Sequence, residues 1–170
     1  AAVTGACCVP GAVLYPPFGG ALKAELTAAV KAKGAPHAIA VCNVKAPEIA
    51  KKVSMESGWT IARSSHKLRN VKNAPDAYTA AVIDDFLKRQ AAGEKAADMA
   101  KAEVVEVEGT KTFRLTKAIP TGELCLNCHG GDNVKPPVVE ALATLYPDDM
   151  ARGFNAGEMR GVFVLTKALE

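Results

Sequence analysis

Residues 103–117 have the sequence EVVEVEGTKTFRLTK, and this stretch decides the fold class. Two runs suited to β-structure, Glu103–Glu108 and Lys111–Lys117, flank the dipeptide Gly109-Thr110. Two such runs around a two-residue turn are typical of a β-hairpin, whose strands are antiparallel. The stretch therefore predicts an antiparallel sheet.

Further strands and several helices are expected around this hairpin. The β-rich runs Trp59–Ser64 and Gly161–Lys167 predict two more strands. Apolar residues at helical spacing, together with stop signals at Gly34 and Pro36, predict helices at Ala21–Lys33, Pro47–Ser57, Asp76–Ala91 and Val138–Tyr146. Helices come first, strands mostly later, and no strict strand–helix–strand alternation occurs. The chain is therefore expected to have an α+β fold, an antiparallel sheet with flanking helices.

Two further expectations concern the long helix and the segment that ends at Cys42. The long helix predicted after the polar loop Arg69–Pro75 should bury one face, made of Ala77, Val82, Ile83, Phe86 and Leu87. The apolar run that ends at Cys42 lies between the first two predicted helices, and we expect it to form a loop.

The chain has 170 residues, which suits one domain with a real core. Residues 1–20 are rich in Gly and Pro and predict an irregular N-terminal arm, so that residues 21–170 form the single domain. The small residues at the start, Ala1–Ala6, are expected just after a removed leader. We interpret the chain as a mature form or a soluble fragment.

Charge and hydropathy argue against a nucleic-acid partner and against a membrane span. The formal net charge is +3, from 21 basic and 18 acidic side chains, and no basic run occurs. A nucleic-acid partner is therefore not expected. No stretch approaches the ~20 apolar residues of a transmembrane helix, so no membrane span is expected.

The pentapeptide Cys125-Leu126-Asn127-Cys128-His129 carries the chemistry. Two thiols separated by two residues can form thioethers with vinyl groups on adjacent pyrroles of a haem, and the adjoining histidine then supplies one axial ligand to the iron. The motif predicts one covalently attached haem c. Because haem c is attached outside the cytoplasm, it also predicts a periplasmic or other extracytoplasmic location.

Two other interpretations of the motif are weaker. A zinc site needs a second chelating pair, and the adjacent Cys7 and Cys8 are poorly spaced for one. A thioredoxin-like redox pair needs a strand–helix–strand unit, whereas Gly130-Gly131 follows the motif at once. Haem is favoured over both, and Cys7 and Cys8 are assigned no haem role.

The second axial ligand is left open by residue chemistry alone. A thiolate lowers the potential of the iron and a methionine raises it. Free cysteines and methionines are more often buried packing residues than ligands. The candidates are His37, His66, Cys42, Met55, Met99, Met150 and Met159.

Several short blocks, taken together, resemble a known family. They are Ala38–Cys42 with Ala46-Pro47, Arg63–Ser65, Lys67–Asn70 with Asn73–Pro75, Cys125–Gly130, Tyr146–Asp149 with Ala151–Phe154, and Gly157–Gly161. The resemblance covers about Ala21 to Leu165 and is to the single-haem c-type family with a PAS-like fold, long catalogued as a domain of unknown function. Its members stand alone or form the extracytoplasmic sensor part of membrane kinases, cyclases and chemoreceptors.

The resemblance implies axial ligation by His129 and Cys42, and it selects Cys42 from the candidates. The sequence departs from the family pattern at His66, where an apolar residue is more usual, so His66 is a candidate alternative ligand or propionate partner.

The polar loop residues Arg69, Asn70 and Asn73 could hold the haem propionates, since a guanidinium matches a carboxylate and amides can donate. An equally good interpretation is that Arg69 and Asn70 cap and brace the following helix.

These features predict a PAS-like haem c domain that senses redox state or a diatomic gas, nitric oxide or carbon monoxide, and reports to a signalling protein. A low-potential periplasmic electron carrier with a redox partner is the alternative. A haem enzyme acting on peroxide or nitrogen oxides is less favoured, because the spacing of His37, His66 and Arg69 selects no acid or base. We therefore expect no enzyme, and an oligomer is compatible with the sequence.

Overall fold

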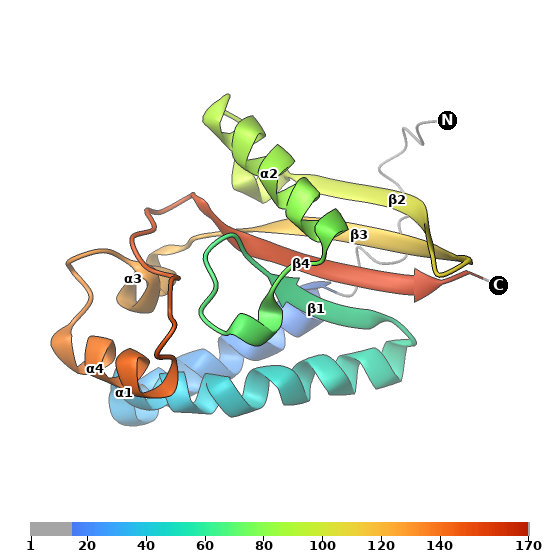
Figure 1. The fold of residues 1–170 in the computed structure, drawn as a ribbon. Helices are drawn as coiled ribbons and strands as arrows, with labels where there is room; N and C mark the ends of the chain where they lie inside the picture. Colours follow the sequence, from blue (N-terminus) through green and yellow to red (C-terminus); the bar gives the residue numbers. More distant parts are fainter. Residues whose placement is uncertain (1–14, 170) are drawn as a thin grey trace.

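A four-stranded antiparallel sheet forms the centre of the computed structural model, which describes residues 15–169 (Figure 1). The strand order is β1-β4-β3-β2. The strands are β1 (Thr60–Ser64), β2 (Ala100–Val107), β3 (Thr110–Pro120) and β4 (Met159–Ala168). The predicted α+β fold, the hairpin and the two further strands are confirmed.

The hairpin turn differs by one residue from the prediction. Val107 pairs with Thr110, so the turn residues are Glu108 and Gly109 rather than Gly109-Thr110. Glu108 has φ +50° and Gly109 has φ +78°. Two successive residues with positive φ are the mark of a type I′ turn, whose twist matches that of the flanking strands.

Helices cover both faces of the sheet (Figure 1). The helix α1 (Tyr15–Ser57) bends at Lys33 and Gly34 into two halves that run side by side beneath one face. The opposite face is covered by α2 (Ala77–Ala91). Two short helices, α3 (Glu123–His129) and α4 (Pro136–Leu145), lie at one end of the sheet, and the turns η2 (Val71–Asn73) and η3 (Ala96–Asp98) flank α2 in the chain. None of the helices within residues 15–169 is long and apolar enough to span a bilayer.

One prediction about α1 is confirmed and three are corrected. The break at Gly34 is confirmed, since Gly34 has φ 82° and ψ 175°. However, residues 15–20 are helical rather than part of an irregular arm, and residues 1–14 of that arm lie outside the described residues. The second half also starts soon after Gly34 and passes through Pro47, which was predicted to begin a helix. Cys42 therefore lies on a helix and not in a loop.

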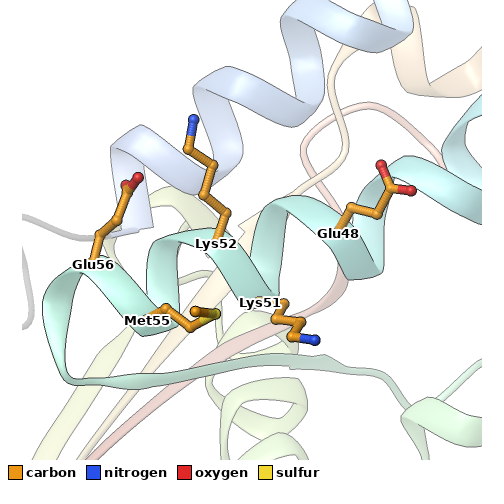
Figure 2. A pocket seen from close by; sticks show the side chains of 5 residues that line it. All are labelled: Glu48, Lys51, Lys52, Met55 and Glu56. Carbon is orange, nitrogen blue, oxygen red and sulfur yellow. The ribbon is translucent and has the colours of Figure 1, made fainter.

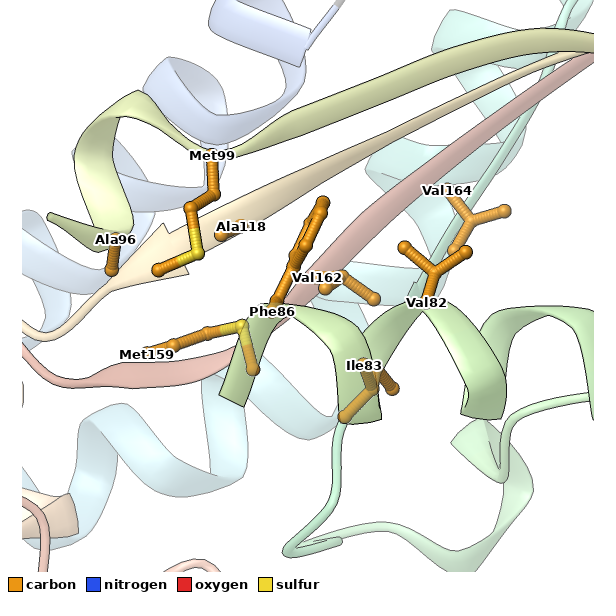
Figure 3. Packing of buried hydrophobic residues seen from close by; sticks show 9 residues of the cluster. All are labelled: Val82, Ile83, Phe86, Ala96, Met99, Ala118, Met159, Val162 and Val164. Atoms are coloured by element: carbon orange, nitrogen blue, oxygen red, sulfur yellow. The ribbon is translucent and has the colours of Figure 1, made fainter. Parts of the chain in front are cut away.

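The core between α2 and the sheet confirms most of the predicted inward face (Figure 3). Val82, Ile83 and Phe86 are buried, and Leu87 packs against them partly buried. Ala77 was predicted to face inward but is exposed, and Thr79 is buried instead. The remaining members of this cluster are Ala96, Met99, Ala118, Met159, Val162 and Val164.

Two smaller clusters lie on the α1 side. One, on the sheet face that α1 covers, consists of Trp59, Ile61, Leu115 and Leu165. The other contains no strand residue; it consists of Ile39, Val134, Val138 and Leu142 and joins the second half of α1 to α4. The chain thus has separate apolar cores on the two faces of one sheet, and the second cluster marks the end of the molecule at which α1, α3 and α4 meet.

A polar contact fixes α2 on the sheet. Asp76 caps α2, its Oδ1 accepting from the Thr79 backbone N–H at 2.7 Å. The Asp76 carboxylate also accepts from Arg114 Nη1 at 2.9 Å. Burial would raise the pKa of the Asp76 carboxyl, but the hydrogen bonds from Arg114 and Thr79 outweigh it and hold the pKa at about 2.

We predict that Asp76→Asn lowers the free energy of unfolding at pH 7 by about 1 kcal/mol, since the half-exposed pair is screened by solvent and the amide still caps α2. A depressed carboxyl pKa stabilises the fold above the unfolded value of about 4 and loses that contribution as the pH falls towards 2. Urea unfolding should therefore show the variant and the wild type converging from pH 4 to pH 2. Asp85→Asn, which removes an exposed partner of Arg89, is the control. A constant difference at every pH would contradict the prediction.

A second prediction concerns the bend in α1. The backbone of Gly34 lies in a region essentially restricted to glycine, so Gly34→Ala should cost about 1–3 kcal/mol of stability in urea unfolding. Gly20→Ala is the matched control, because Gly20 is helical with open space around it and alanine is preferred there by about 0.5–1 kcal/mol. Equal effects of the two substitutions would show that the bend is not strained.

Candidate functional site

The pentapeptide 125–129 forms most of α3, a helix that the sequence did not predict. Cys125 and Cys128 are half-buried free thiols one helical turn apart, so they share one side of the helix. Cys128 packs against the cluster around Ile39 and Leu142. Burial raises the pKa of the Cys128 thiol.

His129 ends α3 and is held in one tautomer. Its Nδ1 donates to the carbonyl oxygen of Ala151 at 2.9 Å, and its Nε2 accepts from Arg69 Nη1 at 3.3 Å. Burial, followed by the charges of Arg69 and Arg160, lowers the pKa of His129 to about 3. The ring is therefore neutral at physiological pH, and Nε2 carries the lone pair with which a histidine binds a metal.

The loop that supplies Ala151 also binds the end of α3 through its backbone. The Phe154 N–H donates to His129 O and the Gly153 N–H to Gly130 O, each at 3.0 Å. The Phe154 ring stands edge to face with the His129 ring, with centroids 6.2 Å apart. His129 is thus fixed by side-chain, backbone and ring contacts from one loop.

Arg69 connects this loop to α3 and to the segment after β1. Its guanidinium donates to both carboxylate oxygens of Asp149 at 3.2 Å, and Nη2 donates to Cys128 O at 2.7 Å and Ala151 O at 3.2 Å. The side chains of Arg69 and Asp149 are only 16% and 8% exposed. A bidentate, largely buried pair of this kind is both strong and directional.

Cys42 approaches the same site from the second half of α1. It lies near enough to Arg63, Cys128 and Arg69 for their charges to act on it. Burial raises the pKa of the Cys42 thiol, and the charge of Arg63 opposes that rise. Cys42 and Cys128, which lie in two separate segments of the sequence, are therefore within electrostatic range of each other, and His129 follows Cys128 at the end of α3.

The other predicted site residues have different positions. Asn70 Oδ1 accepts from the Lys72 N–H at 3.0 Å and caps the short turn η2, whereas the following helix α2 is capped by Asp76. Asn73 contributes its carbonyl oxygen to Ser64 Oγ at 2.8 Å. Neither contact shows a side-chain amide directed at a ligand. A role of Asn70 and Asn73 in holding the haem propionates therefore stays a prediction.

The other candidate axial ligands have varied surroundings, and the choice among them stays a prediction. His37 is exposed near the start of the second half of α1, and the His66 ring meets the Phe154 ring edge to face, with centroids 5.8 Å apart. Met99 and Met159 are fully buried in the core under α2 (Figure 3), whereas Met55 and Met150 are 75% and 68% exposed.

Sequence reasoning assigned no role to Arg63, Asp149 and Arg160. All three belong to the blocks that carried the family resemblance. Their proximity to His129 depends on contacts between segments 60 to 100 positions apart, which no local pattern reveals. The register of β1 and β4 pairs Arg63 with Phe163, and the bulge at Arg160 lies further along β4.

A family model, described as "Tll0287-like: Tll0287", matches residues 15–167. The chain belongs to the Tll0287-like family. The crystal structure of the cyanobacterial heme-protein Tll0287 has the same fold, with a TM-score of 0.70 and 20% identity over 96% of this chain and 98% of that one. No curated protein matches the chain. The sequence-based resemblance to a haem protein family is thus confirmed at the level of this family and fold.

The donor set of this Tll0287-like chain fits a haem c better than a zinc ion. Two half-buried thiols one turn apart, a neutral histidine with a defined lone pair and a third thiol from another helix are what covalent attachment and axial ligation need. Within residues 15–169 no group of three or more His, Cys, Asp or Glu side chains could hold a metal ion.

A surface pocket elsewhere on α1 lacks comparable chemistry (Figure 2). It is lined by Glu48, Lys51, Lys52, Met55 and Glu56, all exposed side chains of balanced charge. It is not a candidate for the functional site.

We predict that Arg69→Leu lowers the free energy of unfolding by about 3 kcal/mol, because it leaves the Asp149 carboxylate buried without its cation. Arg69→Lys should recover only part of the loss, since an ammonium cannot form the bidentate pair. The control is Arg152→Gln, which removes only a contact from Nε to Gly130 O at 3.4 Å. Urea unfolding measures all three variants, and an Arg69→Leu loss no larger than that of the control would refute the bracing role.

Proposed function

We propose that this chain is a monohaem c-type cytochrome, with the haem bonded to Cys125 and Cys128 and ligated by His129 and Cys42. The single observation that carries the proposal is the fixed tautomer of His129 beside the two thiols. The hydrogen bond from Nδ1 to Ala151 O leaves Nε2 as the donor atom and orients the ring before any ligand binds. The structural relative is itself a haem protein by description, which supports the proposal.

The arrangement of the sheet and helices is compatible with the PAS-like domain that the sequence suggested. We propose an extracytoplasmic, periplasmic location, because haem c is attached outside the cytoplasm. A bound haem would supply iron redox chemistry, and the chain would supply its ligands and its surroundings.

Cys42 is the residue that would make this site switchable. Burial favours its neutral thiol, whereas the charge of Arg63 favours the thiolate. A thiolate is a strong donor to ferric iron and a thiol is a poor one. A bond from the iron to Cys42 would therefore depend on whether the Cys42 sulfur is protonated. His129 has no such freedom, because its pKa of about 3 keeps it neutral.

These properties favour a sensor of redox state or of nitric oxide or carbon monoxide, reporting to a signalling protein. The second candidate is a low-potential electron carrier with a redox partner, favoured by the rigid placement of His129. We propose no catalytic role, since the groups beside His129 are engaged: Arg69 with Asp149, and Phe154 with His66.

We predict that Cys42→Ala changes the optical and electron paramagnetic resonance spectra of the ferric protein from low-spin thiolate type and raises its midpoint potential, because thiolate donation is lost. Mass spectrometry should show one covalent haem in both the wild type and the variant. Met150→Leu is the control, since Met150 is exposed and should leave the spectra unchanged. An unchanged ferric spectrum in Cys42→Ala would refute the ligand assignment.

The same samples separate the two roles. A sensor should bind nitric oxide or carbon monoxide when reduced, whereas a carrier should exchange electrons without binding either gas. Steady turnover of peroxide or hydroxylamine would contradict both roles and favour an enzyme.

A further inference from the structure

Two arginines beside the site have been described so far only through their charges, which act on Cys42 and His129. Arg63 lies on β1, two residues after the buried Ile61, and so points to the sheet face that α1 covers. Arg160 lies at the start of β4. Both are half-buried, and both act electrostatically on His129.

A β-bulge sets the position of Arg160. Pro120 pairs with Met159 and Ile119 with Gly161, which leaves Arg160 as the extra residue between them. Ser65 Oγ donates to the Arg160 carbonyl oxygen at 2.7 Å and fastens the bulge to the end of β1. Bulges next to functional sites redirect a side chain out of the regular alternation, and this one brings Arg160 near Arg63.

An unmet hydrogen-bond donor lies beside His129. Arg160 Nε is buried and has no hydrogen-bond partner among the described residues. The neighbouring Arg63 is close enough for the charge of Arg160, after burial, to lower its pKa to about 10. The third arginine near His129, Arg69, already pairs with Asp149. A buried donor such as Arg160 Nε needs an acceptor.

We propose that Arg160, together with Arg63, binds a propionate carboxylate of the haem. The inference rests on the proposed function, because it needs the haem to be present. It assigns the propionate to the sheet, whereas the sequence suggested the loop of Arg69, Asn70 and Asn73. Arg69 already holds Asp149, and Asn70 already caps η2. The forked donors of a guanidinium match a carboxylate, and a carboxylate would satisfy Arg160 Nε.

The test is an infrared titration of the propionates in the haem-loaded protein. Arg160→Gln should raise the apparent pKa of a propionate by about 1–3 units, because a nearby cation that favours the carboxylate is removed. Arg160→Lys should restore most of the wild-type value. Arg89→Gln removes the same charge on the opposite face of the sheet, from α2, and should leave the titration unchanged.

Arg63→Gln gives a second, independent test, with the same direction expected, in case loss of Arg160 disturbs the bulge. Propionate titrations identical to wild type in both Arg160→Gln and Arg63→Gln would overturn the inference. Failure of the proposed function gives a different result, since wild-type protein would then carry no covalent haem by mass spectrometry.

Discussion

The buried pair of Arg69 and Asp149 is the interaction on which the site depends. It joins the segment after β1 to a loop 80 positions later in the chain, and the same guanidinium bonds the carbonyls of Cys128 and Ala151. Ala151 in turn fixes the tautomer of His129. Two buried charges are costly to remove from water, and this cost is offset here because the Arg69 guanidinium bonds both oxygens of Asp149 and two backbone carbonyls. The histidine is therefore oriented by the fold and not by its own helix, which has only seven residues.

The two faces of the sheet differ in how their buried polar groups are satisfied. Under α2, Arg114 is paired with Asp76, and that core is otherwise apolar apart from the buried Thr79 and Thr116. On the α1 side, the charges of Arg63 and Arg160 act on His129, and Arg160 Nε is buried without a hydrogen-bond partner among residues 15–169. A buried donor without an acceptor lowers stability. A bound anion on the α1 side would restore the missing hydrogen bond.

Local patterns predicted the strands, the break at Gly34, the face of α2 and the residues 125–129, because each depends on neighbours within one turn or one hairpin. They failed where distant contacts decide. The second half of α1 continues through Pro47, since the packing of Ile39 and Ile49 on either side outweighs one missing backbone donor. The arginines of the site were placed by sheet register, by a bulge and by an ion pair across the chain. None of these leaves a signal in a short window of sequence.

The continuity of α1 has a mechanical consequence. Cys42 shares one uninterrupted helical segment with Ile49 and Val53, which pack on the cluster that contains Trp59. An α-helix rises about 1.5 Å per residue and resists bending. A rotation or shift at one end is therefore passed to the other end. A displacement of Cys42 is therefore either absorbed at the bend around Gly34 or passed along the helix towards the opposite end of the sheet. The second half of α1 thus connects Cys42 mechanically to the aromatic cluster around Trp59.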